Sequence, residues 1–362
     1  MAAVPSPAPQ SPLLSPLLAA AREAVCAAAA VTRAVQQTLR RDQTLSKDDQ
    51  SPVTIADFAA QAVVIDRLRR HLGTLRVVGE ESSAFLRDPA RFGVSVAALE
   101  AARVSWPEAT RDDFLDTIDF GSASADSPFS PVPSAQCPVP SSFWTLDPID
   151  GTKGFIRGHQ YSVCLALVEN GRVLLAALAC PNLSADFDRP FEDPDPRGTV
   201  YLATETGPVL WHAADDAAAV TQVLVPRRRE PGTPLRLIGS FAASHQNEST
   251  SAAIRRRLGA RGVALAEHRK IDSQCKYAVV ARGQADVFLR TPRPGGGSDC
   301  IWDHAPGSLI AGRAGCIVSD TLGTPLDFAR GDTLSGNSGI LVGRPADHAL
   351  VVAESRAVIS AA

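Results

Sequence analysis

The strongest constraint in the sequence is the segment FWTLDPIDGTKGF, in which a run of apolar residues leads into two acids. Asp147 is followed by a proline and, three residues later, by Asp150. We interpret Pro148 as the stiff point of a turn that lets both carboxylates converge on one point. The next residue, Gly151, permits close backbone approach, so the N–H groups of Gly151 and Thr152 can hold an oxyanion.

The two aspartates of this segment predict a metal site. Two carboxylates held side by side among apolar residues repel each other unless a cation neutralises them. No Cys or His stands beside Asp147 and Asp150, and ligands that are all oxygens favour a hard ion such as magnesium. The alternative is an Asx-type turn without a chemical role.

Three further acids stand at the edges of predicted elements. Asp57 opens a helical pattern, where Thr54 or Asp57 would also serve as a helix cap. Glu80 follows the strand-like residues RVVG and would also be simply solvated. Asp303 precedes another helical run, where the helix dipole alone favours an acid. The adjacent His304 is predicted to be packed or hydrogen-bonded instead of ligating a metal.

The four acidic segments and the Gly-Thr pair make a stronger prediction together than any of them makes alone. They suit a metal-dependent phosphate-ester hydrolase. Sites of this kind use two metals roughly 3.5–4 Å apart to activate water and to stabilise the leaving oxygen.

Composition limits the partners. The chain has 362 residues, of which 45% are hydrophobic and 21% are charged, and its formal net charge is −3. General binding to nucleic acid polymers or to anionic membranes needs a basic excess, so we expect neither. At roughly 100–200 residues per domain, the length predicts two domains or one unit in two parts.

The ends and the cysteines add little that is specific. Seven cysteines without a C-x-x-C pair predict buried, reduced thiols. The uncharged N-terminal residues fit neither a secretory signal nor an Arg-rich transit peptide, so we expect a cytoplasmic location and leave organelle targeting open. Residues 1–12 are predicted to be a disordered tail, 13–39 an Ala-rich helix and 121–142 a Pro/Ser-rich insertion.

The motifs DPIDGT, GEES and WDHAPG, in their spacing along the chain, resemble those of a known superfamily. This is the lithium-sensitive magnesium phosphatase superfamily, which includes inositol monophosphatases and fructose bisphosphatases. Within it, the motifs SPVTIAD, DGTKGF and IDSQCKY…ADVFLR make the chain most similar to the 3′(2′),5′-bisphosphate nucleotidases. Inositol monophosphatases typically carry Thr-Asn-Phe where this chain has Lys-Gly-Phe. The resemblance covers residues 14–355.

The resemblance implies an α+β fold, a layered αβαβα sandwich of the inositol monophosphatase and fructose bisphosphatase type. It also implies two parts. Residues 13–205 would form an N-terminal α+β domain that carries most of the metal ligands and includes the insertion. Residues 206–362 would form a C-terminal α/β domain that contacts the nucleotide and supplies Asp303.

The resemblance further implies residue roles, position by position. The predicted magnesium ligands are Glu80, Asp147, the Ile149 carbonyl, Asp150 and Asp303. The predicted catalytic residues, which orient and deprotonate the attacking water, are Asp57 and Thr152. The predicted substrate contacts are Gly151 and Thr152 on the scissile phosphate, and His245, Ser273, Lys276 and Arg290 on the rest of the nucleotide. The residues around His245, SHQNE, depart from the His-Ser-x-His usual in the family.

The implied activity is a magnesium-dependent, lithium-sensitive phosphatase with two or three Mg²⁺ ions. It would remove the 3′-phosphate of 3′-phosphoadenosine 5′-phosphate to give AMP, and would act on the sulfated form as well, in sulfur assimilation and detoxification. We expect a monomer. Two alternatives remain: an inositol monophosphatase or another sugar-phosphate phosphatase, and a sensor that binds the nucleotide without hydrolysing it.

Overall fold

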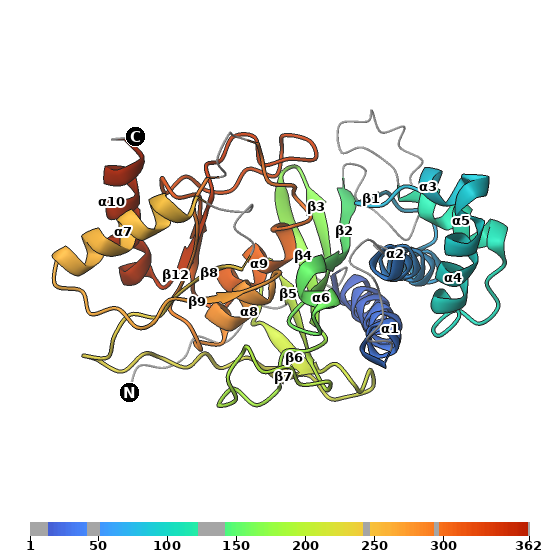
Figure 1. The fold of residues 1–362 in the computed structure, drawn as a ribbon, viewed down its shortest axis with the longest axis horizontal. Helices are drawn as coiled ribbons and strands as arrows, with labels where there is room; N and C mark the ends of the chain where they lie inside the picture. Colours follow the sequence, from blue (N-terminus) through green and yellow to red (C-terminus); the bar gives the residue numbers. More distant parts are fainter. Residues whose placement is uncertain (1–13, 42–50, 122–141, 242–246, 293–296, 361–362) are drawn as a thin grey trace.

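The computed structural model describes residues 14–41, 51–121, 142–241, 247–292 and 297–360. The predicted tail and most of the predicted insertion lie outside these residues, as does His245. Two sheets and three groups of helices make up the described chain (Figure 1). They stack in the order helix, sheet, helix, sheet, helix, which confirms the predicted αβαβα architecture.

The first sheet has its seven strands in chain order. β1 pairs parallel with β2, and the other neighbours are antiparallel. The central strands are buried on both faces, which explains why they read as nearly continuous apolar runs. The strands are β1 Val77–Gly79, β2 Ser142–Asp150, β3 Ser162–Glu169, β4 Arg172–Cys180, β5 Thr199–Thr204, β6 Leu210–Ala213 and β7 Gln222–Val223.

The second sheet is mixed, with the strand order β11-β12-β10-β8-β9. Its strands are β8 Leu237–Ser240, β9 Arg269–Ile271, β10 Val287–Arg290, β11 Ile317–Ser319 and β12 Ile340–Gly343. Along the chain, β7 is the last strand of the first sheet and β8 is the first strand of the second sheet. The predicted division of the chain into two domains stays a prediction.

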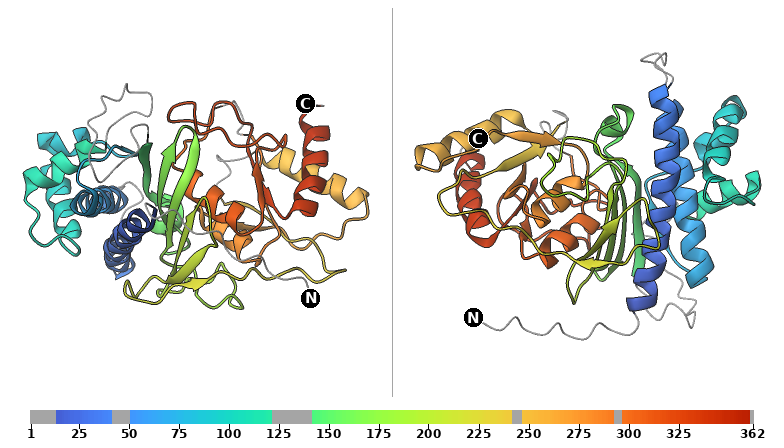
Figure 2. Two further views of the ribbon diagram at one scale, coloured as in Figure 1. Left: turned by 180° about the vertical axis from the view of Figure 1, so that it is seen from behind. Right: turned by 90° about the horizontal axis from the view of Figure 1, so that it is seen from below.

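Helices cover the outer face of each sheet and also fill the space between the two sheets. Two long helices, α1 (Leu14–Arg41) and α2 (Ser51–Leu72), lie side by side on the first sheet (Figure 2). The helices α3 (Ala84–Arg87), α4 (Phe92–Ala102) and α5 (Arg111–Phe120) follow on the far side of α2, joined by a short 3₁₀ turn at Pro89–Arg91.

The central helix layer joins the two sheets into one core. It consists of α8 (Cys275–Ala281) and α9 (Ala305–Arg313), which pack against apolar residues of both sheets. The helices α7 (Glu248–Ala260) and α10 (Pro345–Ile359) cover the outer face of the second sheet. The short helix α6 (Thr152–Ile156) directly follows β2.

Two local predictions are wrong. The helix α2 begins at Ser51, so Thr54 and Asp57 lie inside it and neither caps its N-terminus. Pro148 does not form a turn, because β2 continues through Asp150. The proline occupies an irregular stretch of the strand, between Asp147 and Asp150, where the register shifts. A bulge accommodates proline because the residue has no N–H to offer to the ladder.

Other predictions are confirmed. The Ala-rich helix predicted at 13–39 is α1, and one of its faces is buried against α2 and the first sheet through Ala20, Ala21, Ala24, Ala28 and Ala29. The six cysteines of the described chain are all free, and five of them are buried. Among the described residues, no helix combines the length and the apolar character that crossing a membrane requires.

Candidate active site

The end of β2 brings two carboxylates to one side of the first sheet. Asp147 lies opposite Cys164 of β3, and Asp150 lies opposite Ser162. Residues 162 and 164 share a face because the side-chain period of a strand is two. Asp147 and Asp150 are three positions apart on β2 but pair with residues two positions apart on β3, so β2 contains one extra residue here. This extra residue turns the side chain of Asp150 to the same face as that of Asp147. The convergence predicted from a proline turn is real, but a bulge produces it.

The residue after the bulge must be glycine. Gly151 has φ of +87°, a left-handed conformation that side chains disfavour. A Cβ atom placed there would lie 2.8 Å from Cβ of Ser273, which comes from the second half of the chain. The backbone of Gly151 thus contacts the turn that contains Ser273. Thr152 begins α6, and its hydroxyl donates to the carbonyl of Ile149 at 3.4 Å.

Glu80 reaches the same place from β1. Because β1 and β2 are parallel neighbours, the N–H of Glu80 donates to the carbonyl of Leu146 at 3.2 Å, one residue before Asp147. Desolvation of its carboxyl group raises the pKa of Glu80 to about 7, and repulsion from Asp303 adds to this shift.

Asp303 completes an acidic cluster. It lies in the turn before α9, and ligand oxygens of Asp147, Asp150 and Asp303 lie within 4.8 Å of one another. Burial, then repulsion from Asp303, raises the pKa of Asp150 to about 7. The pKa of Asp147 is raised well above its usual value by burial, then by Glu80 and Asp150. Oxygen ligands this close, in mutual repulsion, fit a hard divalent cation.

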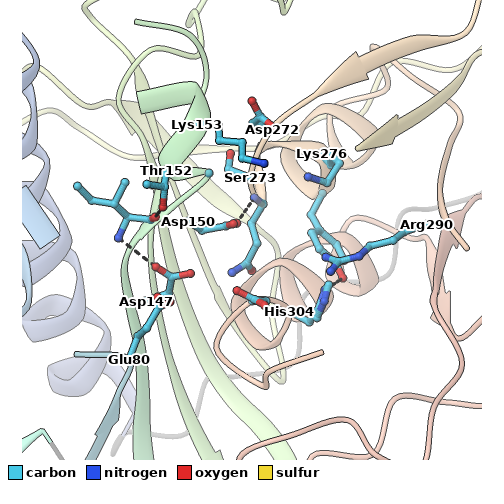
Figure 3. A pocket seen from close by; sticks show the side chains of 15 residues that line it. Glu80, Asp147, Asp150, Thr152, Lys153, Asp272, Ser273, Lys276, Arg290 and His304 are labelled. Atoms are coloured by element: carbon cyan, nitrogen blue, oxygen red, sulfur yellow. Dashed lines mark hydrogen bonds between the residues drawn. The ribbon is translucent and has the colours of Figure 1, made fainter. Parts of the chain in front are cut away.

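The opposite wall of the pocket carries cations (Figure 3). Lys276 of α8 is buried, and this burial lowers its pKa, although Asp150 and Asp272 oppose the shift. Arg290, the last residue of β10, is buried as well and pairs with Asp299 at 2.5 Å. Buried cations such as these need anions nearby.

One pocket gathers most of the predicted site residues. Those that line it are Glu80, Asp147, Ile149, Asp150, Gly151, Thr152, Ser273, Lys276, Arg290 and Asp303. Asp57 is not among the lining residues of the described chain. Its side chain is 8% exposed, and burial, then Glu81 and Glu80, raise its pKa well above the usual range. Asp57 therefore belongs to the same acidic region, close to Glu80 and Asp147. His245 lies outside the described residues.

Comparison with known proteins identifies the family. The model of the inositol monophosphatase family matches residues 13–360. The chain belongs to the inositol monophosphatase family. The solved structures agree in fold: CysQ from Bacteroides thetaiotaomicron superposes with a TM-score of 0.55 at 20% identity, covering 91% of this chain and 97% of that one. Inositol monophosphatase from Anabaena gives 0.57 at 18% identity, with 96% of both chains covered.

Two similar curated relatives are both named as bisphosphate nucleotidases. A protein of Schizosaccharomyces pombe named 3′(2′),5′-bisphosphate nucleotidase is 36% identical over 325 residues, which cover 87% of both chains. A protein of Arabidopsis thaliana named 3′,5′-bisphosphate nucleotidase 2 is 37% identical over 339 residues, which cover 90% of this chain and 91% of the relative.

Several pocket residues of this inositol monophosphatase family member escaped the sequence interpretation. Lys153, Asp272, Gln274 and Tyr277 also line the pocket. Each lies next to a predicted site residue, inside the segments DGTKGF or IDSQCKY, and this adjacency was the only signal for them. The predicted role of His304 is confirmed: it is buried, and its Nδ1 is 2.7 Å from the hydroxyl of Tyr277.

Asp299 was also missed, for a different reason. It pairs with Arg290 at 2.5 Å and lies 3.7 Å from Nε2 of His304. In the sequence it follows the glycine-rich stretch RTPRPGGGS, which carries no helical or strand pattern. No pattern in the sequence connects such a residue with a strand that ended nine positions earlier.

Proposed function

We propose that this chain is a 3′(2′),5′-bisphosphate nucleotidase, a phosphoric monoester hydrolase that removes the 3′-phosphate of 3′-phosphoadenosine 5′-phosphate. The products are AMP and phosphate. The observation that carries the proposal is a single pocket in which a carboxylate cluster faces two buried cations. The names of relatives at 36% and 37% identity over most of the chain support the same substrate class.

The acidic cluster fits magnesium. Its donors are all carboxylate oxygens and their spacing suits one centre. The repulsion among these acids, which adds to the raised pKa values of Glu80 and Asp150, supports a cation there. We propose that Asp147, Asp150, Asp303, Glu80 and the Ile149 carbonyl hold two or three Mg²⁺ ions. When bound, Mg²⁺ neutralises these acids and supplies the positive charge that polarises water and phosphate oxygens.

The chain's own residues divide the remaining work. Gly151 and Thr152, at the start of α6, offer backbone N–H groups to the scissile phosphate. Lys276 and Arg290 bind the second phosphate, because a bisphosphate carries more negative charge than a simple ester and both cations are already desolvated. Ser273 joins them with its hydroxyl.

Asp57 and Thr152 are proposed to orient the attacking water and to accept its proton. Burial raises the pKa of Asp57 above its usual range, which makes its carboxylate a stronger base than an exposed one and supports this role. The hydroxide forms the new bond to phosphorus while the bond to the 3′-oxygen breaks, and the leaving oxygen takes up a proton.

One assay distinguishes this function from its two alternatives. Phosphate release is measured with Mg²⁺ on 3′-phosphoadenosine 5′-phosphate, on its sulfated form and on inositol 1-phosphate. We expect turnover of the first substrate and of its sulfated form. Turnover of inositol 1-phosphate alone would identify a sugar-phosphate phosphatase, and nucleotide binding without turnover would identify a sensor.

The remaining expectations extend the proposal to the whole protein. We propose that the chain acts as a monomer in the cytoplasm on a small-molecule nucleotide. The monomer is tested by the mass measured in light scattering at the assay concentration, and the location by fractionation of cells. A dimer that is stable at nanomolar concentration would overturn the first of these.

A further inference from the structure

Gln274 lies between two of the clustered acids and contacts the chain beside each of them. Its residue exposure is 1%, so its carboxamide must find partners inside the protein. The side-chain Nε2 donates to the carbonyl of Trp302 at 2.7 Å, and Oε1 accepts from the N–H of Gly307 at 2.9 Å. Its backbone N–H donates to Oδ2 of Asp150.

These contacts join parts of the chain that arrive independently. Asp150 ends β2 in the first sheet, whereas Asp303 lies in the turn before α9. Trp302 is the residue just before Asp303, and Gly307 lies in the first turns of α9. The side-chain carboxamide of Gln274 therefore binds the main chain on both sides of Asp303, and the main-chain N–H of Gln274 binds the carboxylate of Asp150.

The turn that carries Gln274 is itself tightly held. Ser273 has φ of +64°, which is uncommon for a residue other than glycine and persists only when the surroundings impose it. The surroundings include two glycines: Gly151, between β2 and α6, and Gly154, inside α6. A Cβ on Gly151 would lie 2.8 Å from Cβ of Ser273, and a Cβ on Gly154 would lie 3.1 Å from Cβ of Asp272.

The opposite side of Gln274 is packed just as closely. A Cβ added to Gly307 would lie 2.4 Å from a ring carbon of Tyr277, so α8 and α9 meet with no room to spare. The Gln274 backbone is thus fixed against β2 on one side and α9 on the other. A residue held in this way can transmit a defined spacing between the two elements.

We propose that Gln274 is a positioning residue that sets the separation of the Asp150 and Asp303 carboxylates, and through it the affinity of the cluster for a divalent cation. The reason is electrostatic. Without a cation the clustered acids repel one another, and the contacts of Gln274 oppose their separation. The carboxamide suits this place because it is neutral and both donates and accepts, whereas a glutamate would add a negative charge to the cluster.

The inference rests on the proposed function only in requiring a Mg²⁺ site at the acidic cluster. The test variant is Gln274→Met, which keeps the volume of the side chain and removes both side-chain hydrogen bonds. The matched control is Gln284→Met. Gln284 donates to the carbonyls of Phe187 and Arg189, at 2.7 and 2.9 Å, and lies outside the pocket.

Calorimetric titration of the full chain with Mg²⁺ measures the dissociation constant without any substrate. Residues that orient metal ligands typically contribute about 10–100-fold in affinity. We expect a rise of that size in Gln274→Met and a change of less than about twofold in Gln284→Met. Both variants lose two side-chain hydrogen bonds to main-chain groups, so we expect both to melt earlier in the absence of metal and only the first to lose metal affinity.

A second variant covers the case in which Gln274→Met does not fold. Gln274→Asn keeps a neutral carboxamide but shortens the side chain, so that it cannot reach both Trp302 and Gly307, and we expect it to weaken Mg²⁺ binding as well. Unchanged Mg²⁺ affinity in a folded Gln274 variant, with normal binding by the wild type, overturns the inference alone. A wild-type chain that binds no Mg²⁺ overturns both the inference and the proposed function.

Discussion

The two walls of the pocket handle buried charge in opposite ways. On the wall formed by β1, β2 and the turn before α9, acids lie against acids, and the pKa values of Glu80 and Asp150 rise to about 7. On the wall formed by α8 and β10, each cation has an acid close by: Arg290 pairs with Asp299, and Lys276 interacts with Asp150 and Asp272.

The difference indicates what each wall binds. The acidic wall is only partly compensated by the chain itself: Lys276 and Arg290 lower the pKa of Asp150, but burial and repulsion from Asp303 outweigh them. This excess of negative charge suits a metal ion. The cationic wall is already compensated in part, which keeps two desolvated cations inside the fold and leaves them able to bind a phosphate. The predictions below test this contrast.

The largest effect is expected from Asp150→Asn. The substitution keeps an acceptor for the N–H of Gln274 and removes a negative charge from the cluster. We expect turnover of 3′-phosphoadenosine 5′-phosphate to fall by at least about 10²–10³-fold, the size found when one electrostatic contact to a transition state is lost. Steady-state phosphate release measures it.

The same variant has a second signature. Because repulsion within the acidic wall is relieved, its metal-free form is expected to melt no earlier than the wild type. Asp116→Asn, at an exposed position on α5, is the control and is expected to change neither quantity. Full activity of Asp150→Asn would refute the metal-site assignment.

The next effect concerns the cationic wall. Arg290→Met removes the cation that pairs with Asp299 at 2.5 Å, and breaking a largely buried pair in this way costs up to about 3–5 kcal/mol of unfolding free energy. Urea denaturation measures the loss. The substitution is also expected to raise the KM for the nucleotide, because a phosphate contact is removed.

A double variant separates these two consequences. Arg290→Met with Asp299→Asn removes both charges, so much of the lost stability is expected to return while the KM stays high. If the KM returned to the wild-type value together with the stability, Arg290 would have only a structural role.

The pH dependence of stability tests the acidic wall again. Glu80 and Asp150 keep protons in the metal-free folded chain up to about pH 7, whereas the unfolded chain releases them near pH 4.5 and 3.8. The folded state then binds more protons, so the metal-free chain loses stability as the pH rises from about 4 to 7. Mg²⁺ binds the deprotonated acids and removes this penalty.

Thermal unfolding therefore is expected to show a larger stabilisation by Mg²⁺ at pH 8 than at pH 6. Glu80→Gln removes one of the titrating groups and is expected to reduce the difference between the two pH values. A stabilisation that does not depend on pH over this range would contradict the account of the acidic wall.

The smallest effect is expected where the two walls meet, at Gly151. In Gly151→Ala the new methyl group meets Ser273 and the backbone keeps φ of +87°, so we expect a loss of about 1–3 kcal/mol in unfolding free energy and a fall in turnover. Gly232→Ala is the matched control. Its φ is +81°, but nothing lies within 4 Å of its Cβ position. An equal loss in both variants would show that the contact with Ser273 is unimportant.

The sequence allowed much of the acidic wall to be predicted, because its chemistry is local. Asp147, Asp150 and Gly151 belong to one short motif, and acids among apolar residues imply a counter-charge wherever the segment lies. The mechanism of convergence was predicted wrongly. A proline after an acid is compatible with both a turn and a bulge, and only the pairing with β3 decides between them.

The positions of Gln274 and Asp299 could not be predicted in the same way. The side chain of Gln274 bonds to the main chain of Trp302 and Gly307. Because every residue has a main-chain carbonyl, the sequence does not indicate which one a side chain will contact. Asp299 follows a stretch without periodicity, so nothing related it to Arg290 before the fold was known.

The sequence by itself predicted the ligand chemistry and the class of reaction, because residue types and short-range spacing carry that information. The five-layer fold was predicted only through the resemblance of the motifs to a known superfamily. Only the tertiary structure decided which charges face each other. Asp303 meets Asp150, and Lys276 and Arg290 face both, because α8 and α9 fill the space between the two sheets. Contacts between such distant residues depend on packing, which a local pattern does not record.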